Sequence, residues 1–92
     1  MEVHELTAIQ RDLLFVVAGL ENASGKGIKR ELERTQDRGL LPGRVYSNLD
    51  ELVEADYVVK VPTGGRENEY CVTDDGHDAI KHRLRWMRRY VA

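Results

Sequence analysis

Hydrophobic residues near the start of the chain recur at the spacing of an amphipathic helix. They follow one another at steps of three or four residues, the pattern of a helix with one buried face: Ile9, Leu13, Val16, Val17 and Leu20. Just before them, Thr7 and Gln10 have the separation of a capping box, in which each side chain bonds the other residue's backbone amide. The pattern therefore predicts a first helix over about residues 8–19.

A second helix is expected to begin after Ser24, whose hydroxyl can cap a helix, and to end at Gly39. Gly25 and Gly27 lower the helix propensity of its first turn. Close packing against the first helix is the favoured reason for them, and close approach of the backbone to a phosphate is the alternative. The apolar residues on the inner side of this helix would be Ile28 and Leu32.

Pro42 indicates the start of a third helix, because a proline at the first helical position lacks only an amide that would be unpaired there. Leu41 has no side-chain oxygen to cap this helix, so its first amides remain available for a phosphate. The pattern predicts a helix over about residues 42–55. Its inner stripe would be Val45, Leu49, Leu52 and Val53, and its outer side Arg44, Ser47, Asn48 and Glu51.

A β-hairpin is expected after the third helix. Residues 57–62 are rich in β-branched side chains, residues 63–66 contain the turn-forming Gly64-Gly65 pair, and residues 67–73 return as a second strand. Because side chains alternate along a strand, Tyr70 and Val72 would share the core side and Cys71 would point the other way.

The last predicted element is a helix capped by Thr73 or Asp74 and running to the end of the chain. Its apolar surface is wider than one small domain readily covers, so we expect it to form a homodimer interface. Packing of the same stripe on the chain's own core is the alternative. The expected interface residues are Ile80, Leu84, Trp86, Met87, Tyr90 and Val91.

The order helix, helix, helix, hairpin, helix predicts a mainly α fold with a β-hairpin wing, a winged helix-turn-helix followed by a C-terminal dimerisation helix. A chain of 92 residues allows little more than one small domain. We expect a DNA-binding domain over residues 1–76 and a dimer helix over residues 77–92. In this fold the third helix enters the major groove and the second crosses the DNA backbone.

The net charge of −2 argues against nucleic-acid binding only until it is divided by position. Residues 24–48 carry six basic and three acidic side chains, a net charge of +3, whereas residues 49–56 carry four acids and no base. Positive charge is therefore concentrated on the second and third predicted helices.

The candidate DNA contacts divide into base readers and phosphate binders. Arg44, Ser47 and Asn48 have the side chains that pair with base edges, and the hydroxyl of Tyr46 could donate to a phosphate. The expected backbone contacts, which give affinity and register without reading sequence, are Lys26, Lys29, Arg30 and, at the wing tip, Arg66. The alternative is that these are ordinary solvated side chains.

Two segments resemble PadR-type transcriptional regulators. Residues 41–49 (Leu-Pro-Gly-Arg-Val-Tyr-Ser-Asn-Leu) with residues 52–58 look like the recognition helix and following turn of that family, and residues 70–76 are similar to its strand before the C-terminal helix. The resemblance implies a repressor-like regulator that is dimeric through its C-terminal helix and binds two half-sites. Longer members have several C-terminal helices around an effector pocket, so ligand control is doubtful here. Ser47 replaces a basic residue of the family, so its operator sequence cannot be transferred.

Other classes of function receive little support. A single cysteine excludes an internal disulfide and a multi-cysteine zinc site, and the three histidines lack ligand spacing. Neither a nucleophile–base pair, a cofactor motif, a secretory leader nor a membrane span is visible, so a cytoplasmic protein without cofactor, metal or catalytic site is expected. Sequence-specific regulation of transcription is the favoured function. A winged-helix protein-interaction module without specific DNA binding is the alternative.

Overall fold

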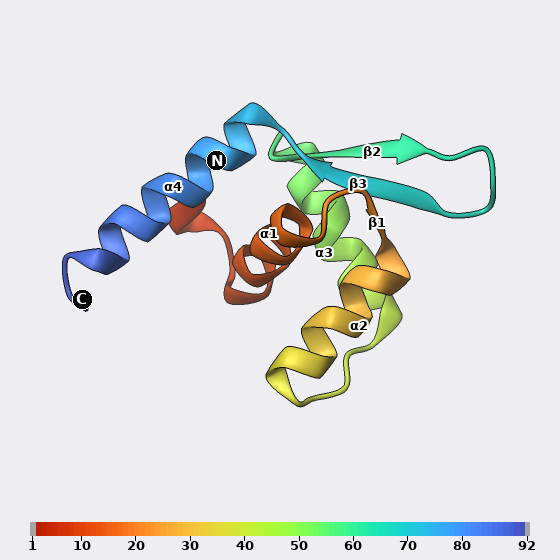
Figure 1. Cartoon of the computed structure of the whole chain (residues 1–92), viewed down its shortest axis with the longest axis horizontal. Helices are drawn as coiled ribbons and strands as arrows, with labels where there is room; N and C mark the ends of the chain where they lie inside the picture. Colours follow the sequence, from red (N-terminus) through yellow and green to blue (C-terminus); the bar gives the residue numbers. More distant parts are fainter. Residues whose placement is uncertain (1, 92) are drawn as a thin grey trace.

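Three helices surround one hydrophobic core in the computed structural model, which describes residues 2–91 (Figure 1). Residue 1, at the start of the predicted DNA-binding domain, and residue 92, at the end of the predicted dimer helix, lie outside the described residues. In chain order the elements are η1 (Val3–Glu5), α1 (Ala8–Leu20), β1 (Ala23–Ser24), α2 (Gly25–Gln36), α3 (Pro42–Glu54), β2 (Val58–Pro62), β3 (Asn68–Val72) and α4 (Asp74–Arg88). The predicted winged helix-turn-helix is confirmed, and the short elements η1 and β1 are additional.

Side-chain caps fix the starts of three helices, as the sequence predicts. The Thr7 hydroxyl accepts a bond from the Gln10 amide while the Gln10 side chain accepts one from Thr7, which completes the capping box of α1. Ser24 caps α2 through the Gly27 amide, and Thr73 caps α4 through the Gly76 amide. These bonds satisfy amides that a helix start otherwise leaves unpaired.

The end of α2 differs from the expectation. The helix ends at Gln36 and its C-cap is Asp37, which adopts the left-handed conformation with φ of 52°. Gly39 therefore lies in the turn to α3 rather than at the helix exit. A short polar side chain such as that of aspartate tolerates this conformation, so the helix can end before it reaches the glycine.

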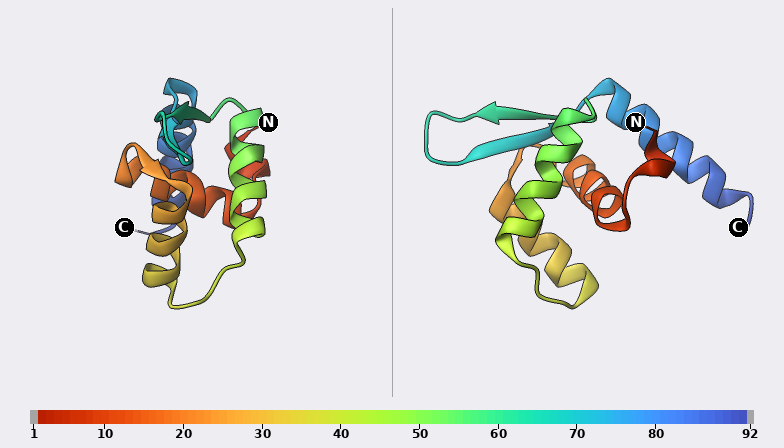
Figure 2. Two further views of the ribbon diagram at one scale, coloured as in Figure 1. Left: turned by 90° about the vertical axis from the view of Figure 1, so that its right-hand side faces the viewer. Right: turned by 180° about the vertical axis from the view of Figure 1, so that it is seen from behind.

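The core lies where α1, α2 and α3 meet below the sheet (Figure 2). Its largest fully buried side chains come from all three helices and from β2: Leu13, Leu14, Val17, Ile28, Leu32, Val45, Leu49, Leu52 and Val58. These positions include most of the inner stripes that the spacing predicts. Leu20, the last residue of the predicted stripe of the first helix, is instead exposed. Val16, Val53 and Val72 are only partly buried at the edge of the same core.

The wing is the outer part of a three-stranded antiparallel sheet in the order β1-β3-β2. Val59 pairs with Cys71 and Lys60 with Tyr70 across the hairpin, and Tyr70 is also opposite Ala23 of β1. Tyr70 is buried, as predicted, whereas Cys71 lies on the other face and its thiol donates a bond to Oδ1 of Asn22. The β1 strand was not predicted because two residues carry no periodicity.

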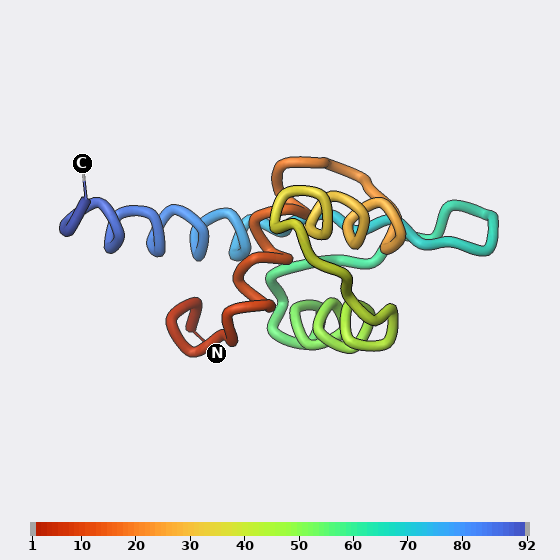
Figure 3. Tube along the Cα trace, turned by 90° about the horizontal axis from the view of Figure 1, so that it is seen from below, coloured from red at the N-terminus to blue at the C-terminus, as the bar shows by residue number. Residues whose placement is uncertain are grey.

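The wing and α4 extend from opposite ends of the molecule, whose principal extents are 43 × 29 × 19 Å (Figure 3). The first turn of α4 packs on the domain, where Gly76 lies so close to the backbone carbonyl of Tyr57 that a Cβ would come within 2.2 Å of its oxygen. The proposed boundary after residue 76 therefore falls inside the first turn of α4. Helix α4 also ends at Arg88, so Tyr90 and Val91 follow the helix instead of belonging to it.

Candidate nucleic-acid interface

The N-terminal half of α3 presents two of the three predicted base readers to solvent. Arg44 and Ser47 are exposed, and no hydrogen bond or ion pair engages the Arg44 guanidinium among residues 2–91. Leu41 gives the helix no side-chain cap, as expected from its sequence. This end of α3 therefore offers a free guanidinium and an exposed Ser47 hydroxyl, which donates a 3.2 Å bond to the Arg44 carbonyl. The Arg44 amide is already bonded to the Leu41 carbonyl at 3.1 Å.

Asn48, the third predicted reader, is half-buried and already bonded. Its Oδ1 accepts a bond of 3.1 Å from Nε2 of Gln10 on α1, and its Nδ2 donates a bond of 2.7 Å to the carbonyl of Arg44. An asparagine that reads adenine uses both of these atoms. In this structure the first atom joins α3 to α1 and the second bonds within α3.

Tyr46 packs against the start of α2, and this contact explains one glycine. A Cβ at Gly25 would lie 2.3 Å from Cε1 of the Tyr46 ring. Gly27 has no such neighbour, since the nearest atom to its Cβ position is Oγ of Ser24 at 3.5 Å. The prediction that Gly25 packs against the first helix is therefore wrong. Its packing partner is the Tyr46 side chain of α3.

A groove lies between the start of α2, helix α3 and the wing. It brings together three residues predicted to contact DNA, Lys26, Tyr46 and Arg66, and adds one that sequence reasoning missed, Lys60. Lys26 pairs with Glu67 of the wing at 3.3 Å, and Lys60 pairs with Asp50 of α3 at 3.4 Å. Both pairs are substantially exposed, so each contributes little to stability and leaves its cation accessible.

Lys29 has a different position from the other predicted phosphate binders. Its ammonium lies 3.1 Å from both carboxylate oxygens of Glu33, one helical turn away. Glu33 in turn accepts a 2.8 Å bond from the amide of Leu40, in the turn between α2 and α3. The Leu40 amide and the Lys29 side chain together hold the pKa of Glu33 below its ordinary value. The four-residue spacing of Lys29 and Glu33 on a helix could have indicated this ion pair from the sequence.

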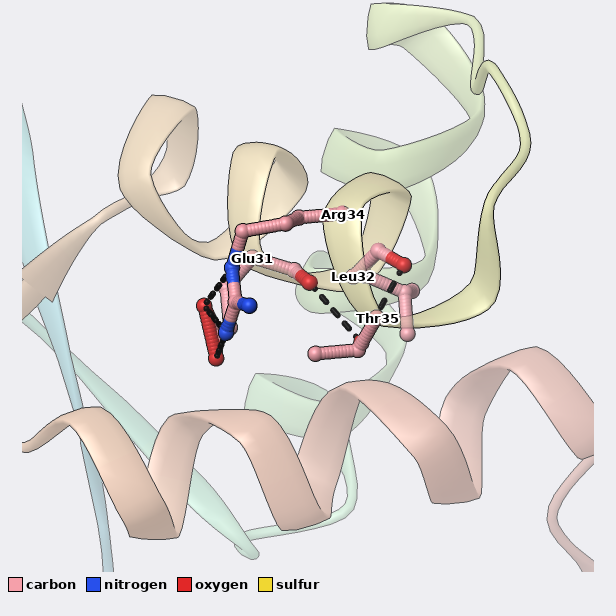
Figure 4. A network of polar contacts seen from close by, with 4 residues as sticks. All are labelled: Glu31, Leu32, Arg34 and Thr35. Carbon is pink, nitrogen blue, oxygen red and sulfur yellow. Dashed lines mark hydrogen bonds and ion pairs between the residues drawn. The ribbon is translucent and has the colours of Figure 1, made fainter.

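The outward side of α2 carries one free and one paired arginine. Arg34 donates three bonds to the carboxylate of Glu31, and the Thr35 hydroxyl donates to the carbonyls of Glu31 and Leu32 (Figure 4). Arg30 is exposed and makes no such pair within the described chain. The same holds for Arg66 at the tip of the wing. Among the basic side chains expected to bind phosphates, Arg30 and Arg66 are therefore the two that no acidic side chain of the described residues pairs with.

Solved structures of other proteins share this architecture. RosR of H. salinarum is 40% identical over 99% of this chain and 83% of its own, with a TM-score of 0.90. The chain belongs to the PadR-like winged-helix transcription regulators. A PadR family transcription regulator from Clostridium difficile R20291 (22% identity, 84% of this chain and 85% of that chain, TM-score 0.66) and the putative transcriptional regulator TA0346 from Thermoplasma acidophilum (20% identity, 90% and 84%, TM-score 0.70) share its fold. No family model and no curated protein matches the sequence.

The C-terminal helix of this PadR-like regulator divides the predicted interface residues into two groups. Ile80 is only 9% exposed and belongs to the core of its own chain, and Leu84 packs at the edge of that core. Ile80 is therefore already covered by its own chain and Leu84 is covered in part, and the assignment of both to a dimer interface stays a prediction. The residues of the second group are exposed: Trp86, Met87, Tyr90 and Val91.

An N-terminal contact, absent from the sequence-based expectations, supports α4 of the regulator. Nη1 of Arg83 lies 3.1 Å from Nδ1 of His4 in η1, and the His4 ring also packs against His82 and Trp86. The Arg83 guanidinium lies 4.5 Å from the centre of the Trp86 ring, a cation–π distance. No local spacing in the sequence could reveal contacts between residues nearly eighty positions apart.

The described residues of the PadR-like regulator contain neither a candidate metal site nor a candidate membrane span. None of them form a group of three or more His, Cys, Asp or Glu side chains able to hold a metal ion. No helix in residues 2–91 is both long and apolar enough to cross a membrane.

Proposed function

We propose that this DNA-binding transcription regulator binds double-stranded operator DNA as a homodimer and represses transcription by occupying the operator. The observation that carries the proposal is the set of accessible groups around α3. The exposed Arg44 and Ser47 of α3 lie beside a groove containing Lys26, Lys60 and Arg66. In a winged-helix complex, α3 would read bases in the major groove while α2 and the wing bind phosphates.

Each side chain has a proposed role that follows from its surroundings. Arg44 is suited to bidentate pairing with guanine and Ser47 to a single bond with a base edge. Tyr46, Lys26, Arg30 and Arg66 would contact phosphates. Lys29 is proposed to act indirectly, because its ammonium is already held by Glu33. RosR has also been solved in three complexes, named RosR-S1, RosR-S4 and RosR-SG.

The homodimer is proposed from the apolar end of the chain. Trp86 packs edge-on against Tyr90, with 5.4 Å between ring centres, and both remain exposed together with Met87 and Val91. A second copy of the same surface would remove these side chains from water, which is favourable in proportion to the apolar area buried. Two copies would then present two recognition helices to DNA. Repression by occupying the operator needs no surface beyond these helices and the dimer interface.

The test is selection of binding sites from random duplexes by the purified protein, followed by mobility-shift titrations at two salt concentrations. Arg44→Ala should weaken binding by about 1–3 kcal/mol and relax preference at one base pair, whereas Arg66→Ala should weaken binding to all sequences and lower the salt slope by about 1. Arg34→Ala, whose guanidinium is held by Glu31, is the matched control and should bind like the wild type. Salt-insensitive binding, or an unchanged affinity in Arg44→Ala, would contradict the proposal.

A further inference from the structure

We propose that Asn48 is a positioning residue for α3, acting through Gln10 of α1, and that it does not read a base. The inference deepens the proposed function, since it rests on α3 being the helix that enters DNA. It differs from the expectation drawn from sequence, which placed Asn48 beside Arg44 as a second direct reader. The deciding feature is a hydrogen-bond chain that joins the starts of the two helices.

The chain of bonds runs from the cap of α1 to the backbone of α3. Oε1 of Gln10 accepts from the Thr7 amide at 3.0 Å, and Nε2 of the same side chain donates to Oδ1 of Asn48 at 3.1 Å. Nδ2 of Asn48 then donates to the Arg44 carbonyl at 2.7 Å. Both ends of both amide side chains are therefore in use. The first bond fixes the rotamer of Gln10, so its Nε2 has a defined place to meet α3.

Burial makes the link between Gln10 and Asn48 costly to break. Gln10 is 8% exposed although its side chain is polar, and a buried amide without a partner loses its hydration with no compensating bond. If Asn48 turned outward to an adenine, Nε2 of Gln10 would lose its bond to Oδ1. The carbonyl of Arg44 would at the same time lose the shorter of its two side-chain bonds, keeping the 3.2 Å bond from Oγ of Ser47. The folded protein thus favours the inward orientation of Asn48.

The opposite flank of α3 is held by a separate contact. There the Tyr46 ring fits against Gly25 of α2. Helix α3 is consequently fixed on both flanks near its N-terminal half, with Arg44 and Ser47 exposed. Since a bidentate contact to a base needs a defined approach of the reading side chain, the link to α1 would determine how well Arg44 meets its base pair.

The test compares specific with non-specific DNA affinity in full-length variants. Gln10→Met and Asn48→Ala should each lower affinity for the selected operator by about tenfold, the size expected from losing one hydrogen bond that orients the reader. Affinity for random duplex, which depends on phosphates, should stay unchanged, so the ratio of the two affinities falls. The double variant should lose no more than either single one, because both changes break the same link.

Two further variants separate this effect from misfolding. Gln10→Glu keeps an acceptor for the Thr7 amide but removes the donor to Asn48, and it should show the same fall in the ratio if Gln10→Met does not fold. Gln36→Met is the matched control, since its Nε2 bonds Asp12 of α1 at the protein surface, away from α3, and it should keep the wild-type ratio.

The outcomes distinguish the inference from the function on which it rests. An operator preference at one base pair that is lost in Asn48→Ala and intact in Gln10→Met would show that Asn48 reads that base, and would overturn the inference. An unchanged affinity ratio in both Gln10 variants would overturn it as well. Absence of salt-sensitive DNA binding in the wild type would instead reject the proposed function.

Discussion

At the scale of single residues, the charged carboxylate of Glu33 binds the turn between α2 and α3. Its carboxylate receives the Leu40 amide and the Lys29 ammonium, and these contacts lower its pKa. A carboxyl group whose pKa is lowered by folding stabilises the protein above the pKa of the unfolded chain, about 4.3. That contribution is lost as the pH falls through the lower pKa of the folded protein.

Glu33→Gln should therefore reduce stability at neutral pH, because the substitution removes the charge that holds Lys29 and the Leu40 amide. The difference between wild type and variant should shrink as the pH falls through the folded pKa of Glu33, where the wild type becomes neutral too. Urea unfolding between pH 7 and pH 3 measures both effects. Glu54→Gln, the same change at an exposed position near the end of α3, serves as the control. A difference that stayed constant across this range would contradict the assigned role of Glu33.

At the scale of elements, the contact between α2 and α3 depends on the glycine at the start of α2. Gly25→Ala should displace the Tyr46 ring and weaken DNA binding, since a Cβ there would come within 2.3 Å of Cε1. Gly27→Ala, two residues later, meets nothing closer than 3.5 Å. It should bind DNA normally and gain up to about 1 kcal/mol of stability from its better helix propensity.

Mobility-shift titration and urea unfolding of the two glycine variants measure the two effects separately. Equal DNA affinities in the two variants would show that the placement of Tyr46 does not matter for binding. Loss of binding in Gly27→Ala alone would favour a close approach of the α2 backbone to a phosphate, the alternative that the sequence left open.

At the scale of the whole molecule, the end of α4 should determine the oligomeric state. Trp86→Glu places a charge in the exposed apolar surface, and we expect it to convert a dimer into a monomer of 10.5 kDa. Sedimentation equilibrium at micromolar concentration measures the mass. Lys81→Glu, which introduces the same acid at an exposed position of the same helix, should leave the dimer intact. A wild-type protein that sediments as a monomer would reject the homodimer.

Dimer loss should also affect DNA binding in a defined way. In a symmetric complex of this class, two recognition helices meet half-sites about 10 base pairs apart, one turn of DNA. The monomeric variant should bind a single half-site as the wild type does and lose the additional affinity for the paired site.

The sequence predicted what depends on local spacing. Helical periodicity located the inner stripes of α1, α2 and α3, and the caps Thr7 and Ser24 followed from residue type and spacing, whereas the sequence left Thr73 and Asp74 as alternatives for α4. The Gly-Gly pair located the hairpin. Each of these features is specified within about ten residues, which is the range over which periodicity and turn chemistry act.

Contacts between distant segments could not be predicted in the same way. Asn48 has the side chain of a base reader, and only the fold shows that Gln10 occupies its amide. Ile80 belongs to an apolar stripe, and its burial depends on how far α4 lies on the domain before leaving it. The helical pattern gives the face of a residue but not the element that covers this face.

The strand β1 has a consequence for the thermodynamics of binding. Because β1 and β2 flank β3, the root of the wing is bonded on both edges, and only residues 63–67 lie between the paired strands. Fixing one backbone residue costs about 1–2 kcal/mol in conformational entropy. If the wing tip orders on DNA, this cost is confined to that short segment, and Arg66 can adjust to a phosphate while the sheet keeps its shape.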